Sequence, residues 1–413
     1  MALNLASPGI QVREVDLTIG RVDATSGSIG AIVAPFTKGP VEEAQLIESE
    51  EDLLQTFGQP YSVDKHYEYW MVASSYLAYG GTMQVIRAND DGLKNAYVGV
   101  NTVAPLIKSE THYNQLGYDD NAITGITIAA KTPGSYANGI RVSIIDAKAD
   151  QILTVADGTP TVVGTAVTQT AVGRQKVTGV GVGTEALDGY IKGVVAASTR
   201  TTIEVKLLSH VSAAGTVTPV DYKPGGTYNF TNTGIVGLTT AGIGVTNGFA
   251  KTYTQQVDWF STQEIELTSK DQNGNAVKLE WDALADRPGT SSYVASRGGR
   301  FDELHVVVID DKGDITGNAG TILEKHVNLS KASDGEYSVG STSYWRKYLA
   351  TNSQYIYGGS APSGITTTGF SIQATNTLDA DSGWDQDAAE VNFGASGVVT
   401  ASLGGGTNYG DKT

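Results

Sequence analysis

The side chains that most often carry chemistry in proteins are dispersed along this chain. The five histidines are His66, His112, His210, His305 and His326. No two of them stand four residues apart with a glutamate between, so the helical zinc pattern HExxH is absent. We interpret them as surface or packing residues, and the sequence assigns no catalytic residue and no metal ligand.

Glycine and serine motifs do not indicate a nucleotide site or a hydrolase. GVGVG at 179–183 has G-x-G spacing, but no helix is expected after it. A dinucleotide phosphate site needs a helix N-terminus at that point. Neither GxxxxGK[ST] nor GxSxG occurs in the chain. No cofactor and no enzymatic activity are therefore expected.

The nearest approach to a metal loop is DQNGNAVKLEWD at 271–282. Its first, third, fifth and twelfth positions carry oxygen side chains, as in an EF-hand: Asp271, Asn273, Asn275 and Asp282. Position six is Ala276, where a calcium loop needs glycine. Asn-Gly between alternating segments instead predicts a β-hairpin.

Carboxylate pairs and aromatic residues have simpler interpretations. The pairs Asp90–Asp91, Asp119–Asp120 and Asp310–Asp311 lie in turn sequences, where neighbouring aspartates are usually solvated. Aromatic side chains cluster at Tyr61, Tyr67, Tyr69, Trp70, Tyr76 and Tyr79. This cluster favours a core or interface helix over a sugar or base platform, because tyrosine suits both packed environments.

The composition limits the class of protein. The chain has 413 residues, 50 glycines, 17% charged residues and a formal charge of −16, which disfavours nucleic acid as a partner. It has no cysteine, which excludes disulfides and thiolate chemistry and suits a cytoplasmic product. No signal peptide is visible and the apolar runs are too short to span a bilayer, so we expect a soluble protein.

Near the N-terminus the pattern predicts one α/β unit. A buried strand is expected at 29–34, and a further strand is expected at 82–90. A helix is expected within 49–60, where Ser49 would be the N-cap and Gly58 would end the helix. The strongest helix is expected at 64–81, capped by Asp64, with an apolar face of Tyr67, Trp70, Met71 and Leu77. The unit is too small for a complete domain, so further strands must come from elsewhere.

The remainder predicts an α+β multidomain protein in which a mixed α/β core unit is interrupted by β-rich insertions. Short Gly/Thr/Val runs predict an all-β sandwich or barrel at 150–250. A mixed α/β insertion is assigned to 93–149 with 251–384, and a partial core to 23–92 with 385–413. The last residues, GGGTNYGDKT, resemble an internal turn, so we expect a longer protein.

Residues 1–22 are predicted to form an extended arm. Within it, SPGIQVREVD at 7–16 begins with a turn and continues in strand-like alternation. A terminal strand needs a partner for its backbone groups, either in its own domain or in another molecule.

Four ordered segments resemble the contractile tail sheath proteins of myovirus-type phages. They are the SPG-initiated arm, SGSIGAIVAPFTKGP, LIESEEDLLQTFGQP, and YWMVASSYLAYGGTMQVIRA. TPGSYANGIRVSI at 132–144, the segment from HVVVIDDKGDI to YWRKYLATNSQYI, and LGGGTNYGD at 403–411 are also similar to family motifs. No family motif is found at 150–250, as expected for a variable outer domain.

The resemblance implies a structural virion protein. Sheath subunits form stacked hexameric rings around an inner tail tube, between baseplate and tail terminator proteins, and contract to drive the tube through the host envelope. Assembly would take place in the host cytoplasm. The resemblance also implies that the arm adds a strand to a neighbouring subunit, through Ser7, Pro8, Gly9, Ile10, Val12 and Val15.

Two alternatives remain at this point. A β-rich host-surface or glycan-binding module would use the Thr/Gly-rich insertion and the tyrosines, and it predicts a concave aromatic pocket within 150–250. The sheath of a bacteriocin or of a secretion-type contractile machine belongs to the same class as a phage sheath, and the sequence does not separate them.

Overall fold

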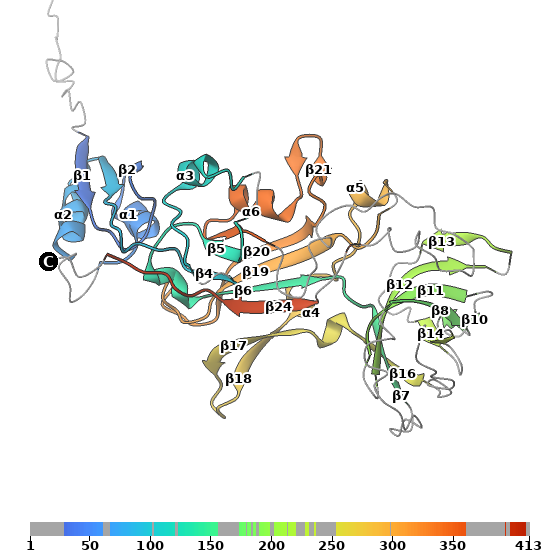
Figure 1. Cartoon of the computed structure of the whole chain (residues 1–413). Helices are drawn as coiled ribbons and strands as arrows, with labels where there is room; N and C mark the ends of the chain where they lie inside the picture. The colour runs from blue at the N-terminus through green and yellow to red at the C-terminus, as the bar shows by residue number, and fades with distance from the viewer. Residues whose placement is uncertain are drawn as a thin grey trace, which may run out of the picture. The chain divides into compact units, whose positions relative to one another are not determined.

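The computed structural model describes most of the chain. The described residues are 29–60, 67–100, 103–119, 123–155, 173–178, 180–182, 185–186, 190–198, 202–212, 214–219, 228–230, 235–236, 253–297, 299–360, 393 and 397–409. The chain divides into two compact units, Met1–Asn89 and Asp90–Thr413, called here the N-terminal unit and the second unit. Both combine helices with small sheets (Figure 1), so the predicted α+β class is confirmed in outline.

The N-terminal unit holds a three-stranded sheet in the order β1-β3-β2. β1 (Gly30–Ala34) is parallel to β3 (Met83–Arg87), and β2 (Ala44–Ile47) is antiparallel to it. The strands at β1 and β3 and the two helices of this unit were predicted. β2 was not, because four residues following a Glu-Glu pair give too little alternation to identify a strand.

Helix α1 (Glu50–Phe57) begins and ends where its sequence signals predict. The hydroxyl of Ser49 accepts a hydrogen bond from the amide of Asp52 at 3.1 Å, which satisfies a free N–H of the first turn. Gly58 closes the helix at φ +78°, and its amide donates to the carbonyl of Leu54 at 3.0 Å. Leu53 and Phe57 are buried, so this helix is confirmed.

Helix α2 (Tyr67–Ala78) is confirmed, but its buried face is not the predicted one. The buried residues are Trp70, Ala73, Ser74 and Leu77. Tyr67 and Met71 lie on the exposed side, because the small residues at 73 and 74 rather than the large ones at 67 and 71 approach the sheet. The predicted cap Asp64 lies outside the described residues.

The second unit is organised around a four-stranded sheet in the order β20-β19-β6-β24. Its strands are β6 (Ile140–Asp146), β19 (Glu303–Asp310), β20 (Thr321–Ser330) and β24 (Val398–Ser402). Ile144 and Val306 face a core with Trp345, while Ile145 and Val307 face one with Trp281. Both faces of β19 are buried, which explains the continuous apolar run at 306–309.

Strand β24 pairs antiparallel with β6. The sequence grouped residues 385–413 with 23–92 in a partial core domain, and β24 is the strand of that segment that the structure describes. The structure does not test the predicted domain bounds as a whole, and they stay a prediction.

Smaller elements surround this sheet. β5 (Ile126–Ala130) lies between β4 (Tyr97–Gly99) and β23 (Ile356–Gly358), and two hairpins join β17 (Glu264–Lys270) to β18 (Ala276–Glu280) and β21 (Glu336–Ser338) to β22 (Ser341–Thr342). The helices are α3 (Glu110–Gln115), α4 (Trp281–Leu284), α5 (Ser292–Ala295) and α6 (Trp345–Asn352), with short 3-10 turns at Ser135–Gly139 and Phe260–Thr262.

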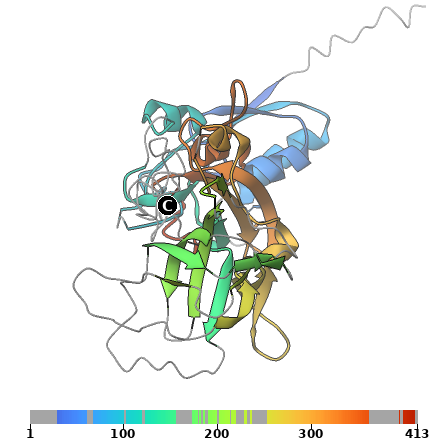
Figure 2. The same cartoon turned by 90° about the vertical axis from the view of Figure 1, so that its right-hand side faces the viewer.

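The described elements between residues 151 and 258 are all strands, as the composition predicts. They are β7 (Gln151–Val155), β8 (Gly173–Thr178), β9 (Val180–Val182), β10 (Glu185–Ala186), β11 (Tyr190–Ser198), β12 (Thr202–Val211), β13 (Val217–Pro219), β14 (Tyr228–Phe230), β15 (Ile235–Val236) and β16 (Tyr253–Asp258). The main sheet has the order β15-β8-β11-β12-β7-β16, and Figure 2 shows its green strands side by side. We call this stretch the β insertion.

Candidate assembly interface

The structure describes the side chains of three histidines, His112, His305 and His326, and each makes a hydrogen bond to a nearby residue. His66 and the side chain of His210 lie outside the described part of the chain. His305 is buried, its Nε2 lies 2.7 Å from the carbonyl oxygen of Asp286, and its Nδ1 accepts from the amide of Asn328. Burial lowers the pKa of His305. His326 contacts Glu324, and His112 accepts from the amide of Lys108. No group of three metal-binding side chains comes together within the described residues.

The loop at 271–275 is the predicted hairpin turn. β17 and β18 pair antiparallel on either side of it, and Gly274 adopts φ +84°. The Asp271 carboxylate accepts from the amides of Asn273 and Asn275, each at 2.8 Å, and the bond from Asn275 is the main reason its pKa is lowered. Its oxygens thus bind the backbone of their own turn, as an Asx turn does.

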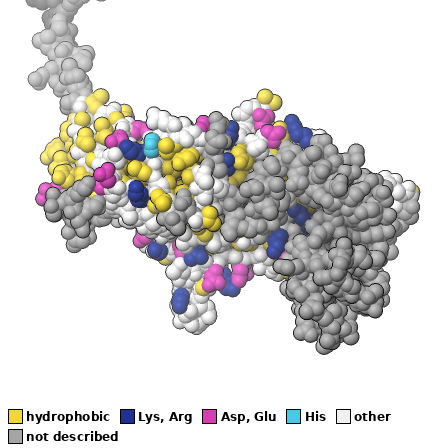
Figure 3. All heavy atoms as spheres, in the orientation of Figure 1, with side chains coloured by type: hydrophobic (Ala, Val, Ile, Leu, Met, Phe, Trp, Pro, Cys, Tyr) yellow, Lys and Arg dark blue, Asp and Glu magenta, His cyan; other side chains and the backbone are white. Residues whose placement is uncertain are grey.

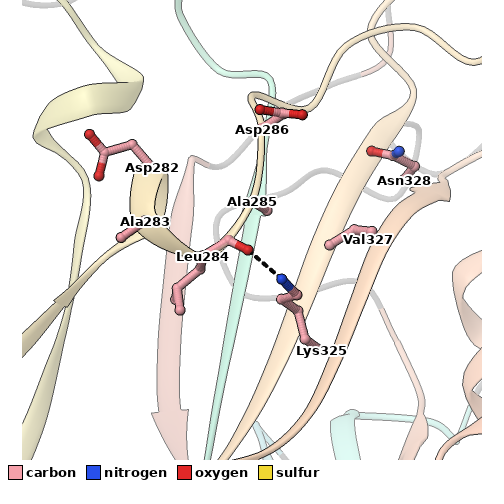
Figure 4. Close-up of a pocket in the computed structure, with 8 residues that line it drawn as sticks. All are labelled: Asp282, Ala283, Leu284, Ala285, Asp286, Lys325, Val327 and Asn328. Atoms are coloured by element: carbon pink, nitrogen blue, oxygen red, sulfur yellow. Dashed lines mark hydrogen bonds between the residues drawn. The ribbon is translucent and has the colours of Figure 1, made fainter.

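A shallow pocket of about 380 Å³ lies beside β20 (Figure 4). It is lined by Asp282, Ala283, Leu284, Ala285, Asp286, Lys325, Val327 and Asn328. Lys325 closes one side by donating to the carbonyl oxygen of Leu284 at 2.7 Å. None of the lining side chains is aromatic, and the pocket lies outside residues 150–250. It is therefore not the aromatic pocket that the glycan-binding alternative predicts.

The predicted strand-exchange residues of the arm, Ser7, Pro8, Gly9, Ile10, Val12 and Val15, lie outside the described residues. What the structure does describe is the sheet that follows the arm directly in sequence. β1 and β2 are the two edges of that sheet, and neither has a second strand partner in the described part of the chain. Unpaired strand edges are templates for another extended segment.

One face of this sheet packs against the helices, and the other carries apolar side chains that no described element covers. Ile47, Met83 and Val85 point into the core with Leu53, Trp70 and Leu77. On the opposite face the strand register places Val33 beside Ile86 and Leu46 beside Gln84. Val33 is 65% exposed and Leu46 is 51% exposed. We call the residues Ala31, Val33, Ala44, Leu46 and Ile86 the open sheet face.

Helix α2 presents a second apolar surface. Tyr69, Val72 and Tyr76 of the helix and Tyr79 in the turn after it recur at spacings of three, four and three residues, so they line one side of it. Tyr76 also packs against the core that contains Trp70 and Leu77. Val72 is 61% exposed and Tyr79 is 94% exposed, while Tyr76 is half-buried. Only one residue of α2, Glu68, is charged. We call these four residues the α2 stripe.

Figure 3 shows hydrophobic side chains gathered over the N-terminal unit. An exposed surface that is rich in tyrosine and aliphatic residues and poor in charge has the composition of a protein–protein interface core. The arrangement suits burial against another polypeptide and provides no group for covalent chemistry.

Sequence reasoning identified the helix of tyrosines as a core or interface element but missed the open sheet face. The signal was present in part. The strand GAIVA places Ala31 and Val33 on one side and Ile32 and Ala34 on the other, and both sides are apolar. That pattern was interpreted as a fully buried strand, whereas only one side is covered within the described residues.

Comparison with known proteins gives short matches. No family profile matches the chain. The chain is 35% identical to the tail sheath protein of Enterobacteria phage T4 over 95 residues, which are 23% of this chain and 14% of that protein. It is 33% identical to the tail sheath protein of Vibrio phage KVP40 over 88 residues, 21% of this chain and 13% of that protein. The chain thus covers less than a sixth of the length of each curated relative.

Two solved structures are also similar in part. The sheath tail protein from Desulfitobacterium hafniense is 17% identical and aligns over 54% of this chain and 38% of its own, with a TM-score of 0.19. The sheath tail protein Lin1278 from Listeria innocua is 18% identical over 50% and 36%, with a TM-score of 0.18. TM-scores this low carry no argument about the fold. The curated matches agree with the resemblance seen in the motifs: over 95 and 88 residues, the chain is similar to the tail sheath proteins of two phages.

Proposed function

We propose that this chain is a subunit of a contractile tail sheath, which polymerises around an inner tail tube and contracts to drive that tube through the host envelope. The observation that carries the proposal is the similarity to two tail sheath proteins, at 35% and 33% identity. These relatives support a structural role in a phage particle. Contraction, the tube and the envelope are the further steps that the proposal adds.

The N-terminal unit supports a role in polymerisation. Its sheet has two unpartnered edges and an apolar open sheet face, all within the described residues. Burying Val33 and Leu46 alone against a neighbour would contribute about 1.5–3 kcal/mol for each side chain that becomes fully covered. Contacts between different surfaces of identical subunits generate open helical arrays, as a sheath requires.

The arm is proposed to supply the flexible link between subunits. Ser7, Pro8 and Gly9 would form the turn, and Ile10, Val12 and Val15 the strand that pairs with the sheet of a neighbouring subunit. Backbone hydrogen bonds along a strand are independent of side-chain identity, so such a link survives re-packing of the surfaces around it. The acceptor sheet in a neighbouring subunit would be the one that contains β1, β2 and β3.

The proposed partners are copies of the same chain in stacked hexameric rings, the inner tube protein, and the baseplate and tail terminator proteins. The proposed location is the virion, after assembly in the host cytoplasm. The role is structural rather than enzymatic, in agreement with the relatives. A bacteriocin or secretion-type sheath would use the same interfaces, and the genes that neighbour this one would distinguish the machines.

The test removes the arm. Deleting residues 1–20 should abolish the tubes that the protein forms alone, as seen by negative-stain electron microscopy, and leave the second unit folded. Two double variants test whether the arm acts by pairing as a strand or merely by being present. Ile10→Pro with Val12→Pro removes two backbone donors and should abolish the tubes, while Ile10→Thr with Val12→Thr keeps strand propensity and should retain them. Unchanged tubes in the deletion variant would contradict strand exchange.

A further inference from the structure

The β insertion leaves and re-enters the rest of the second unit at one place. β7 begins directly after Asp150, and β16 ends at Asp258. The two strands pair antiparallel, with Gln151 opposite Asp258. The amide of Trp259 donates to the carbonyl oxygen of Asp150 at 3.3 Å, which continues the ladder by one more step. The outgoing and returning chains are therefore neighbours at the root of the insertion.

One side chain, Arg287, contacts both chains at this root. Its Nη1 donates to the carbonyl oxygen of Ala149 at 3.0 Å and lies 3.4 Å from Oδ1 of Asp150. Its Nη2 donates to the carbonyl oxygen of Asp150 at 3.3 Å and to the carboxylate of Asp258. The Arg287 side chain is only 14% exposed. The guanidinium thus joins the outgoing segment to the end of β16.

Asp150 carries the connection into the middle of the insertion. Its Oδ2 accepts from the amide of Leu207 in β12 at 2.7 Å, while its Oδ1 faces Arg287. Burial raises the pKa of Asp150, and Arg287 and the Leu207 amide act in the opposite direction. Both oxygens of this buried carboxylate are therefore used, one on each side of the root.

The surroundings of this root combine charged side chains with the apolar Ala149, Trp259 and Phe260. Lys206, next to Leu207, lies with its Nζ 4.3 Å from the centre of the Phe301 ring, and Lys331 forms a fully buried ion pair with Asp146 at 2.8 Å. Such groups contribute little net stability, because desolvation offsets their attraction. They do require defined geometry, since a displaced partner leaves a buried charge without compensation.

We propose that Arg287 is a positioning residue that fixes the direction in which the β insertion leaves the rest of the second unit, so that the insertion and the four-stranded sheet β20-β19-β6-β24 move as one body. The planar guanidinium is suited to this role because its donors point in fixed directions and bind both chains at once. A lysine at the same position would supply one ammonium group and could not hold the same set of acceptors. The proposal concerns this chain alone and does not depend on the proposed sheath function.

The test measures the distribution of insertion orientations in the whole chain. Because the chain has no cysteine, Ala214→Cys in the insertion and Ala319→Cys in the turn before β20 give two unique, exposed sites for spin labels. Pulsed electron spin resonance should give one narrow distance distribution for the otherwise unchanged protein. Arg287→Lys should broaden it at least twofold, and should raise the hydrogen-exchange rate of the Leu207 amide about tenfold.

Arg141→Lys is the matched control. Arg141 also bridges a carboxylate and a backbone carbonyl, through Asp311 at 2.9 Å and Glu266 at 2.7 Å, but it anchors the β17–β18 hairpin. It should leave the distribution narrow. If the Arg287→Lys protein does not fold, the Asp258→Asn variant takes its place in the test, because it weakens the same bridge between Arg287 and β16. An unchanged distribution with unchanged exchange at Leu207, or equal broadening by Arg141→Lys, would overturn the proposal.

Discussion

The Nε of Arg87 donates to the carbonyl oxygen of Phe36 at 2.7 Å, and this bond joins the end of β3 to the turn that follows β1. The same guanidinium donates to the carbonyl oxygens of Gly39 at 2.9 Å and Thr37 at 3.2 Å. Trp70, in the same segment as Arg87, contacts the segment LIESEEDLLQTFGQP in the same way, since its Nε1 donates to the carbonyl oxygen of Gly58 at 2.9 Å. The segments that resemble sheath proteins are thus held together by side chains of their own.

Arg87→Lys should destabilise the N-terminal unit by about 2–3 kcal/mol, because a compact ammonium cannot reach all three carbonyl oxygens that the planar guanidinium binds. Hydrogen bonds to charged groups contribute roughly 1.5–3 kcal/mol each. Hydrogen exchange of the β1 and β3 amides measures the effect. Arg297→Lys is the control, since Arg297 lies at an exposed site where it donates to Tyr293. Equal protection of β1 and β3 in both variants would show that Arg87 does not hold the turn.

Local signals explain how much of this fold could be predicted. Ser49 and Gly58 define α1 because caps act within one turn. Gly274 marks the β17–β18 hairpin because the five-residue loop at 271–275 has positive φ at that position. The pairing of β24 with β6 joins residues more than 250 positions apart, such as Val398 and Ile145. No local pattern encodes that choice of partner, so it could not be predicted from the sequence.

The open sheet face should be required for self-association. Val33→Glu with Leu46→Lys places two charges where apolar side chains would be covered, and each would lose its hydration on assembly. We expect the double variant to remain folded and monomeric, as measured by sedimentation velocity. Val339→Glu is the control, because Val339 is 100% exposed at the β21–β22 turn. Association of the double variant at the normal concentration would exclude this face as an interface.

The α2 stripe makes a separate prediction. Val72→Glu should weaken self-association at least tenfold, because a buried, unpaired carboxylate costs more than the ~1.4 kcal/mol that corresponds to a factor of ten. Ser75→Glu introduces the same charge on the same helix at an exposed position outside the stripe. The two variants therefore separate a loss of this surface from a general effect of added negative charge. Equal weakening by both would assign the effect to charge.

Lys206 should make the stability of the second unit depend on pH. Burial lowers its pKa from 10.5 to about 7, with the neighbouring charge of Lys331 as the second cause. Between these values the unfolded chain binds a proton that the folded chain does not, so this group makes the free energy of unfolding rise with pH. Below about pH 7 Lys206 is protonated in both the folded and the unfolded chain, so its destabilising effect is at its maximum and no longer changes with pH.

Lys206→Met should remove this cost. The variant should be more stable than the unchanged protein at about pH 6, with a gain on the order of 1.4 kcal/mol per unit of pKa shift, and the gain should shrink toward pH 10. Urea unfolding at several pH values measures it, and Lys347→Met at an exposed position is the control. If the free energies of unfolding of Lys206→Met and of the unchanged protein differ by the same amount at every pH from about 6 to 10, the lowered pKa of Lys206 is contradicted.

The candidate interface shows what sequence alone could and could not locate. The tyrosines of α2 were visible as a cluster, but which of them face outward depends on how Ala73 and Ser74 approach the sheet. Likewise, β1 is apolar on both sides, and only the packing of α1 and α2 decides which side is covered. Periodicity therefore identifies the elements, and the tertiary contacts identify the surface.

The most direct test of the central claim is negative-stain electron microscopy of the protein expressed alone from its complete gene. The sheath assignment predicts long hollow tubes of stacked rings, and it predicts that Val33→Glu with Leu46→Lys abolishes them while Val339→Glu does not. A folded protein that stays monomeric at concentrations up to tens of micromolar, with no tubes and no rings, would contradict it.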